Sequence, residues 1–520
     1  MTAPAPERRA GELNLRELLR WAWRQLTSMR TALILLLLLA LAAIPGSVIP
    51  QSNIDALKTS NWQDAHPKLT PVYEKLQLFS VYDSPWFSAI YILLVLSLVG
   101  CIIPRCFVYA RAIRNKPPAA PRNLSRLADH TSWSTTEEPD EVLARAAVVL
   151  KKRRYRVVPA SASASASGDA VSAEKGYLRE VGNLLFHLSV LIVLVGFAAG
   201  GLFGYKGGVI VVEGGGFSNL LNQYDDYDPG SLFDPDSMEP FSFDIEKFDA
   251  QWLVSGPRAG MAYKFVSHLR YQESPDSPEK TYDLRVNHPL KIGSTEIFLI
   301  GHGYAPSFTI TDGDGNATST GPVVFLPLDQ TFRSIGVVKD PDASPKQIGL
   351  EGEFYPTYAT NAEGFPFSAF GNALDPRVSL LAYVGDLGLD DGVPQSVYSL
   401  RKDGVELLHR PNGKIFRLDL QVGQTMKLPD GMGSVRFDGF QRWNKIQISR
   451  TPGTHVALAG VLLALLGLMG SLFIRPRRVW LRVRREDGVT LVELAGLDRS
   501  GGGDTLAELE ALRALVEEKR

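Results

Sequence analysis

Cysteine is almost absent from the chain, which has two cysteines, Cys101 and Cys106, in 520 residues. Two cysteines cannot supply a disulfide framework for a large extracellular domain. Neither lies in a Cys-x-x-Cys-His sequence, so the chain is not itself a cytochrome c with covalently attached haem. Their spacing corresponds to about 140° on a helix, and Pro104 lies between them. We therefore expect packing or lipidation, rather than a shared metal, for this pair.

A large net charge is also missing. The formal charge of -1 gives the chain no overall attraction for nucleic acid. Charge is missing locally as well, because four long apolar stretches contain no Asp, Glu, Lys or Arg: residues 31–49, 85–104, 181–205 and 451–474. Each can cross a bilayer core of roughly 30 Å as a helix. The sequence thus predicts a polytopic α-helical membrane protein with four spans.

The first span has one competing interpretation. Ala40-Leu41-Ala42 resembles the cleavage site of a secretory signal peptide. The region before the span is long for a signal peptide, however, and the apolar run continues past the supposed cut. Residues 1–30 carry arginines together with leucine and tryptophan at helical spacing. This pattern predicts a basic amphipathic helix on the cytoplasmic face of the membrane.

Arginine and lysine set the expected orientation in the cell membrane. They are dense before the first span and after the second, so residues 50–84 should form an outer loop and residues 105–180 a cytoplasmic segment. Arginines after the fourth span place residues 475–520 in the cytoplasm as well. Both termini are therefore expected to be cytoplasmic, with residues 206–450 on the outside.

The cytoplasmic segments should contain some structure of their own. A helix followed by a strand predicts a small α/β unit before the Ala/Ser run at residues 160–168, which has the composition of a flexible linker. The basic cluster from Lys151 to Arg156 favours contact with the membrane surface. The tail should contain a strand and a charged helix that is either solvated or docked.

Residues 206–450 contain short alternating segments between turn residues. This pattern predicts an extracytoplasmic β-rich domain with one or two sandwich-like units. Its histidines, His268, His288, His302 and His409, do not have the spacing of a metal site. We expect ordinary hydrogen bonds at His288 and His302, which lie in strand or turn contexts.

His187 lies inside the third span. An imidazole within a membrane helix costs free energy unless it is ligated or hydrogen-bonded, so His187 is a candidate functional residue. The alternative is a neutral histidine bonded to a backbone carbonyl or to a neighbouring helix. His455 lies near the outer end of the fourth span.

Four stretches make the sequence recognisable. They are SMRTALILLLLLALAAIPGSVIPQ, EKGYLREVGNLLFHLSVLIVLVGFAAGGLFGYKGGVIVVEG, NHPLKIGSTEIFLIGHGYAP and TPGTHVALAGVLLALLGLMGSLFI. Together they resemble the ResB family of cytochrome c biogenesis proteins. The resemblance implies a membrane complex that carries haem across the membrane and attaches it to apocytochrome c on the outer face. Haem b would be a transient cargo of this complex.

The resemblance also implies a partner, a polytopic cytochrome c assembly protein with a tryptophan-rich haem-handling motif. That partner should be a separate chain, because the eight tryptophans here are scattered. Apocytochrome c and the lipid bilayer are the other implied partners, and nucleic acid is not expected. We recognise no catalytic residues, since no Ser-His-Asp or Cys-His arrangement is readable. The alternative function is a membrane-anchored scaffold or envelope sensor without a haem role.

The resemblance assigns His187 as an intramembrane haem ligand, a role that suits a neutral imidazole. From their positions along the two spans, at about 1.5 Å of rise per residue, His187 and His455 should differ in membrane depth by something like 15 Å. The two axial nitrogens of one haem are only about 4 Å apart. The second ligand of a haem at His187 is therefore expected from the partner. His455 either contributes to an outer haem site or extends its ring to the headgroups.

Overall fold

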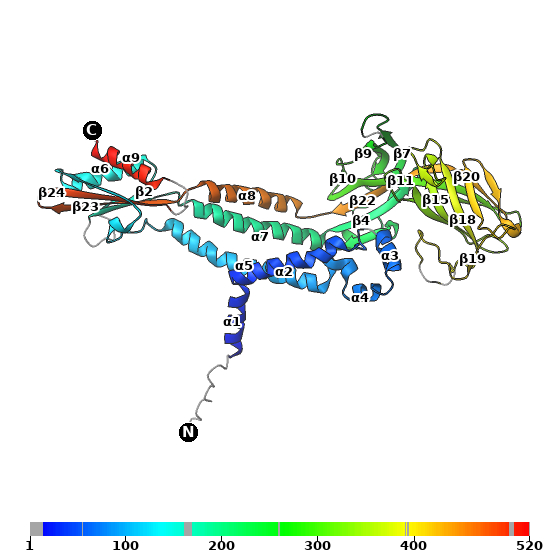
Figure 1. The fold of residues 1–520 in the computed structure, drawn as a ribbon, viewed down its shortest axis with the longest axis horizontal. Coiled ribbons are helices and arrows are strands. Elements are labelled where there is room, and N and C mark those ends of the chain that lie inside the picture. Colours follow the sequence, from blue (N-terminus) through cyan, green and yellow to red (C-terminus); the bar gives the residue numbers. More distant parts are fainter. Residues whose placement is uncertain are drawn as a thin grey trace, which may run out of the picture. The chain divides into compact units, whose positions relative to one another are not determined.

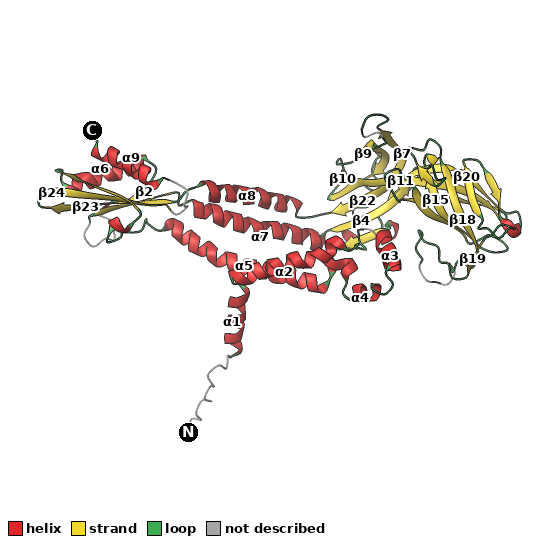
Figure 2. Cartoon of the chain, viewed as in Figure 1, coloured by secondary structure: helices red, strands yellow, loops and turns green. Residues whose placement is uncertain are grey.

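The computed structural model describes residues 14–518, with the exception of residues 55, 161–168, 258–259, 390–391, 393–394 and 499–503. Most of the predicted Ala/Ser linker therefore lies outside the described residues. The chain divides into two compact units, of which the first contains residues 1–197 and 454–520 and the second contains residues 198–453. Figure 1 follows the chain through both units, and Figure 2 distinguishes their helices from their strands.

Within the described part of the chain, four helices are long and apolar enough to cross a membrane. They are α2 (Met29–Val48), α5 (Pro85–Arg114), α7 (Arg179–Phe203) and α8 (Thr454–Phe473). Each contains or closely matches one predicted span. The main difference is in α5, which continues to Arg114 because Pro104 is accommodated inside the helix, as neighbouring helices often allow for proline in membrane segments.

A short amphipathic helix, α1 (Leu15–Leu26), precedes α2. None of its residues is buried, and the apolar side chains of Leu15, Leu19 and Trp23 are more than half exposed. Its first turn is closed by the Glu17 side chain, which accepts a hydrogen bond from the Asn14 backbone N–H. The predicted amphipathic helix is thus present in the described part of residues 1–30.

The segment between α2 and α5 is helical, although we expected only a loop there. It contains α3 (Ala56–Ala65), α4 (Thr70–Lys75) and the 3-10 helix η1 (Leu78–Asp83). The buried side chain of Gln51 connects its two ends, because its amide nitrogen donates to the Leu78 carbonyl and its oxygen accepts from the Val81 backbone N–H. These hydrogen bonds tie the segment to the end of α2.

Glycines bring α7 and α8 into close contact. A Cβ atom on Gly467 of α8 would lie 2.4 Å from the backbone nitrogen of Phe186 on α7. A Cβ atom on Gly460 would lie 2.8 Å from a side-chain carbon of Val193. Small residues of this kind allow helix backbones to approach in lipid. The pairing is antiparallel, because later residues of α7 meet earlier residues of α8.

The first unit also contains an α/β domain, which we call the terminal domain. It combines chain from both sides of α7 and α8 in one antiparallel sheet of order β1-β24-β23-β3-β2. Its strands are β1 (Asp129–Thr135), β2 (Arg156–Val158), β3 (Ala170–Lys175), β23 (Arg477–Glu486) and β24 (Val489–Asp498). Helices α6 (Pro139–Lys152) and α9 (Thr505–Glu517) share a core with this sheet. The predicted strand and charged helix of the tail are therefore confirmed, and the helix is docked.

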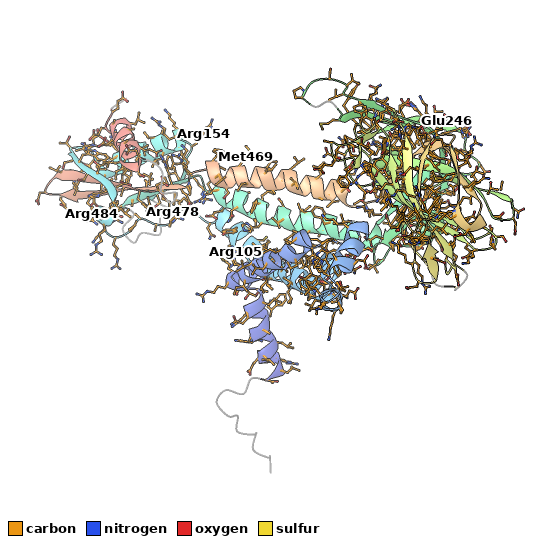
Figure 3. All side chains as sticks on the ribbon, turned by 45° about the vertical axis from the view of Figure 1, so that its right-hand side comes forward. Arg105, Arg154, Glu246, Met469, Arg478 and Arg484 are labelled. Carbon is orange, nitrogen blue, oxygen red and sulfur yellow. The ribbon has the colours of Figure 1, made fainter. Side chains whose placement is uncertain are left out.

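Several arginines of the terminal domain form ion pairs rather than remaining available to lipid. Glu174 pairs with both Arg156 and Arg478, at 3.0 and 3.2 Å. Arg482 is 4% exposed and pairs with Asp169. Figure 3 labels Arg478 together with Arg154 and Arg484 in this domain, and the latter two side chains are exposed. The arginine density near the fourth span thus has a structural role in addition to any effect on orientation.

The second unit holds the β-rich domain. Its central sheet has the order β10-β11-β22-β4-β6 and is flanked by two further sheets, β5-β7-β8-β9 and β13-β14-β15-β18-β19. The central strands are β4 (Tyr205–Val212), β6 (Asp226–Pro229), β10 (Leu290–Ile292), β11 (Thr295–Thr311) and β22 (Ser434–Arg450). The first flanking sheet contains β5 (Gly216–Ser218), β7 (Ser242–Trp252), β8 (Ala262–Gln272) and β9 (Lys280–Arg285). The second contains β13 (Leu326–Pro327), β14 (Ser334–Asp340), β15 (Ile348–Tyr355), β18 (Arg377–Gly385) and β19 (Val405–Leu407).

The long strands β11 and β22 connect two sandwich-like halves. Phe243 and Ile245 on the first flanking sheet pack with Ile297 at the beginning of β11. Leu350 on the second flanking sheet packs with Phe308 near the end of β11. One central pair of strands therefore supports two hydrophobic cores, which confirms the prediction of a β-rich, sandwich-like domain.

Candidate functional site

His187 lies in the third turn of α7 and is half-buried. Its Nδ1 is 2.8 Å from the carbonyl oxygen of Asn183, one turn earlier in the same helix. A carbonyl oxygen only accepts, so Nδ1 carries the proton and donates it. In the neutral ring the lone pair is then on Nε2, which is the arrangement of a metal-binding imidazole. This is the carbonyl bond that the alternative, structural role of His187 predicts, and it leaves the lone pair of Nε2 free of the proton.

The helix α5 covers one side of His187. Ile102, Arg105 and Tyr109 of α5 meet His187 around a space of about 10 Å³, and Figure 3 labels Arg105. Such a volume admits about one water molecule. A porphyrin does not fit between α5 and α7 at this level.

His455 is the second residue of α8, and its side chain is exposed. Gly460 of α8 faces Val193 of α7, which is six residues after His187, and His455 lies five residues beyond Gly460 in the same direction. At 1.5 Å per residue, these eleven residues correspond to about 16 Å. The structure does not bring the two histidines together, in agreement with the separation expected from the spans.

The two cysteines do not form a pair. Cys101 donates a hydrogen bond from Sγ to the Thr27 carbonyl at 2.7 Å, where the chain passes from α1 to α2. Both thiols are free and half-buried. Cys101 therefore packs α5 against the start of α2, which is the structural role expected for it.

The β-rich domain contains a site that the sequence did not reveal. His302 is 9% exposed on β11, and its Nδ1 is buried with no hydrogen-bond partner among the described residues. The expectation of ordinary hydrogen bonding is therefore wrong for this residue. His288, in contrast, has an exposed side chain in a turn.

A β-bulge explains why His302 faces inward. The pairing of β11 with β22 shifts between Leu299 and Gly301, so that Ile300 is an extra residue. Leu299 faces the core, and strict alternation would then direct Gly301 and Gly303 inward. The bulge reverses the phase and directs His302 and Tyr304 inward instead. Alternation alone does not reveal a bulge, although the GHG sequence is a signal of irregular backbone.

His302 lies among aromatic rings at the wall of a cavity of about 560 Å³. The Phe332 ring stacks on the imidazole with 4.5 Å between centroids, and Phe265 and Phe248 lie at 4.8 and 4.9 Å. Burial, together with the nearby positive charge of Arg442, lowers the pKa of His302 to about 3. The imidazole is therefore neutral at physiological pH.

Comparison with known proteins covers both units. Residues 29–510 match the ResB-like family. The cytochrome c biogenesis protein CcsB of Synechococcus sp. (strain CC9311) is 26% identical over 406 residues, which cover 75% of this chain and 84% of that protein. CcsB of Thermosynechococcus vestitus is 24% identical over 469 residues, covering 88% and 87%. CcsB of Nostoc sp. (strain PCC 7120) is 24% identical over 462 residues, covering 86% and 83%.

Proposed function

The chain belongs to the ResB-like family of multi-pass membrane proteins, and from this membership we propose that it carries haem b across the membrane and presents it for attachment to apocytochrome c. Haem would be a transient cargo. The chain would work as a subunit of the haem-attachment complex, because no catalytic residue of its own is recognised. The attachment of haem to apocytochrome c requires reduced thiols, reduced iron and a correct orientation of the two reactants more than it requires a protein nucleophile.

We propose that His187 is an axial ligand of the haem during its passage. The observation that carries this assignment is the hydrogen bond from Nδ1 to the Asn183 carbonyl at 2.8 Å. It fixes the tautomer with the lone pair on Nε2 and holds the ring against rotation. In an apolar span, such a nitrogen can bind iron without first losing a proton.

The second axial ligand would come from the tryptophan-rich partner. His455 is separated from His187 by about 16 Å along the helix pair, which is too far for one iron. The space between α5 and α7 is also too small for a porphyrin. Leu188 and Val195 mark a face of α7 that remains 42% and 63% exposed. This face adjoins His187 at roughly 80–100° around the helix, and we propose that the haem lies between the partner and this side of α7.

The orientation in this proposal follows the arginine distribution, with the terminal domain in the cytoplasm and the β-rich domain outside. The β-rich domain would hold apocytochrome c or the partner near the emerging haem. Crosslinking of a Cys-x-x-Cys-His peptide in the assembled complex would test this role. Crosslinks to the partner alone, with none to residues 206–450, would contradict it.

The haem role is tested by purifying the chain with its partner after haem-replete expression. We expect a Soret band that decreases with His187→Ala, which leaves only haem bound elsewhere, and that is unchanged with His288→Ala, because the His288 side chain is exposed in a turn. A colourless wild-type complex, or equal Soret bands in both variants, would instead favour a membrane-anchored scaffold.

A further inference from the structure

The cavity beside His302 has the size and lining of a small-molecule site. Its volume of about 560 Å³ lies within the range of roughly 300–1,000 Å³ typical of such sites. Trp252, Phe265 and Phe332 supply aromatic walls. Among the described residues of the lining, Asp329 is the one acidic residue, and it already accepts hydrogen bonds from Thr331 and Arg333. The remaining surface therefore suits a flat apolar ligand.

The cavity opens between apolar side chains that remain in contact with water. The exposed fractions are 50% for Met261, 47% for Val286, 50% for Ile300 and 42% for Leu328. Four large apolar side chains gathered around one opening are unusual on a protein surface and mark a binding site. An amphiphilic ligand can bury its apolar part below this rim and leave charged groups in water.

Two polar groups of the cavity lack partners within the described chain. They are Nδ1 of His302 and Nε1 of Trp252, each on a residue that is 9% exposed. Burial of a polar group without a partner is costly, and natural structures rarely tolerate it without a functional reason. Because Nδ1 is fully shielded, Nε2 is the ring nitrogen that remains for a ligand.

We propose that this cavity is a haem site of the β-rich domain, in which Nε2 of His302 provides an axial ligand and the porphyrin lies against Phe265, Phe332 and Trp252. The site lies on the second unit and is distinct from His187, which lies on the first. This inference rests on the proposed function for the identity of the ligand. Binding forms one bond from iron to Nε2 in place of a weakly held water and requires no electron transfer.

Several properties of the cavity favour haem over a purely apolar ligand. The imidazole is neutral, so its lone pair is available for iron. The Trp252 ring lies at 79° to the imidazole and can face a porphyrin bound through it, whereas Phe332, stacked on the imidazole at 20°, would meet the porphyrin with its edge. The open rim leaves the two carboxylates of haem in solvent, and no lysine or arginine of the described lining is needed to receive them. A simple hydrocarbon would make no bond to Nε2, whereas the iron of haem would; Nδ1 gains no partner from either ligand.

The test uses the full-length chain in detergent with the substitution His187→Ala. This substitution removes the proposed haem ligand on α7. Ferric haem is titrated and the Soret band is recorded for His302→Phe and for the matched control His288→Ala. We expect His302→Phe to weaken haem binding at least tenfold and to remove the spectrum of a nitrogen-ligated iron. Phenylalanine keeps an aromatic ring in the cluster, and a melting temperature no lower than that of the wild type verifies folding.

A second titration with metal-free protoporphyrin separates ligation from apolar binding. His302→Phe should change protoporphyrin affinity by less than about twofold, because this ligand has no iron for the imidazole. Haem binding that is equally tight in His302→Phe, or absent from the His187→Ala protein, overturns the inference. With each substitution also made alone in the wild-type chain, loss of haem from His187→Ala and none from His302→Phe would overturn this site and leave the proposed function intact. The reverse pattern would support this site and contradict the role of His187.

Discussion

The Nδ1 of His187 donates to the backbone carbonyl of Asn183, and not to the Asn183 side chain. The hydrogen bond therefore depends on the helical backbone rather than on the identity of residue 183. It fixes the ring with Nε2 directed away from its own helix turn. A tautomer held by main chain alone should survive substitutions that would disrupt a side-chain partner.

Asn183→Ala tests this relationship. We expect the haem content of the purified complex to stay within about twofold of wild type, because alanine preserves the helix and the carbonyl acceptor. His187→Ala should lose the haem bound at this helix in the same preparation. The Soret absorbance per protein measures both effects. A loss with Asn183→Ala as large as that with His187→Ala would show that the amide side chain contributes to the site.

His302→Phe should raise the thermal stability of the protein without ligand. The wild-type ring buries a nitrogen that has no partner among the described residues, at a cost of about 1–3 kcal/mol, whereas phenylalanine removes that cost and stays among Phe265 and Phe332. Thermal unfolding in detergent measures the change, with His288→Phe as an exposed control. A lower melting temperature for His302→Phe would show that the imidazole stabilises the fold.

The same residue predicts a pH dependence. The folded His302 has its pKa lowered to about 3, whereas the unfolded residue has an ordinary value of about 6.5. Below 6.5 the unfolded chain binds a proton that the folded chain does not, so stability is complete above that pH and is lost as pH falls toward 3. Lowering the pH from 7 to 5 should therefore reduce the free energy of unfolding by about 2 kcal/mol through this residue. His302→Phe should lose less stability over the same interval, as measured by unfolding at both pH values.

Much of the architecture could be predicted because its signals are local. Charge-free stretches of membrane length correctly identified α2, α5, α7 and α8, and alternation correctly indicated a β-rich domain. His187 could be selected because any histidine in a span stands out. His302 could not be selected, because its inward direction depends on the bulge at Ile300. A one-residue shift in strand register moves each side chain to the opposite face of the strand. The amino-acid composition of the strand contains no signal of such a shift.

Close packing between α7 and α8 predicts a sharp difference between two glycine substitutions. Gly467→Ala should destabilise the helix pair, because its Cβ would lie 2.4 Å from the backbone of Phe186. Gly201→Ala should be nearly neutral, since its Cβ meets nothing within 4 Å. Melting temperatures in detergent compare the two. Equal melting temperatures would mean that α7 and α8 separate in the membrane.

The terminal domain shows the other limit of sequence reasoning. The strand and helix of the tail were predicted, but β23 was not, because its sequence is as rich in arginine as a membrane flank. Nor does any local pattern indicate that β23 pairs with β3, about 300 positions earlier. Sheet pairing between distant segments is decided by the shared core rather than by either segment alone.

Docking of α9 into that core gives the last prediction. Leu509 is fully buried, whereas Leu506 on the same helix is 44% exposed. Leu509→Ala should destabilise the terminal domain by about 2–4 kcal/mol, through lost burial and the cavity left behind. Leu506→Ala should change its stability by less than about 0.5 kcal/mol. Limited proteolysis of the full-length protein measures the difference, because release of α9 exposes the C-terminal segment to cleavage. Equal protection in the two variants would contradict a docked helix and would place α9 in solvent.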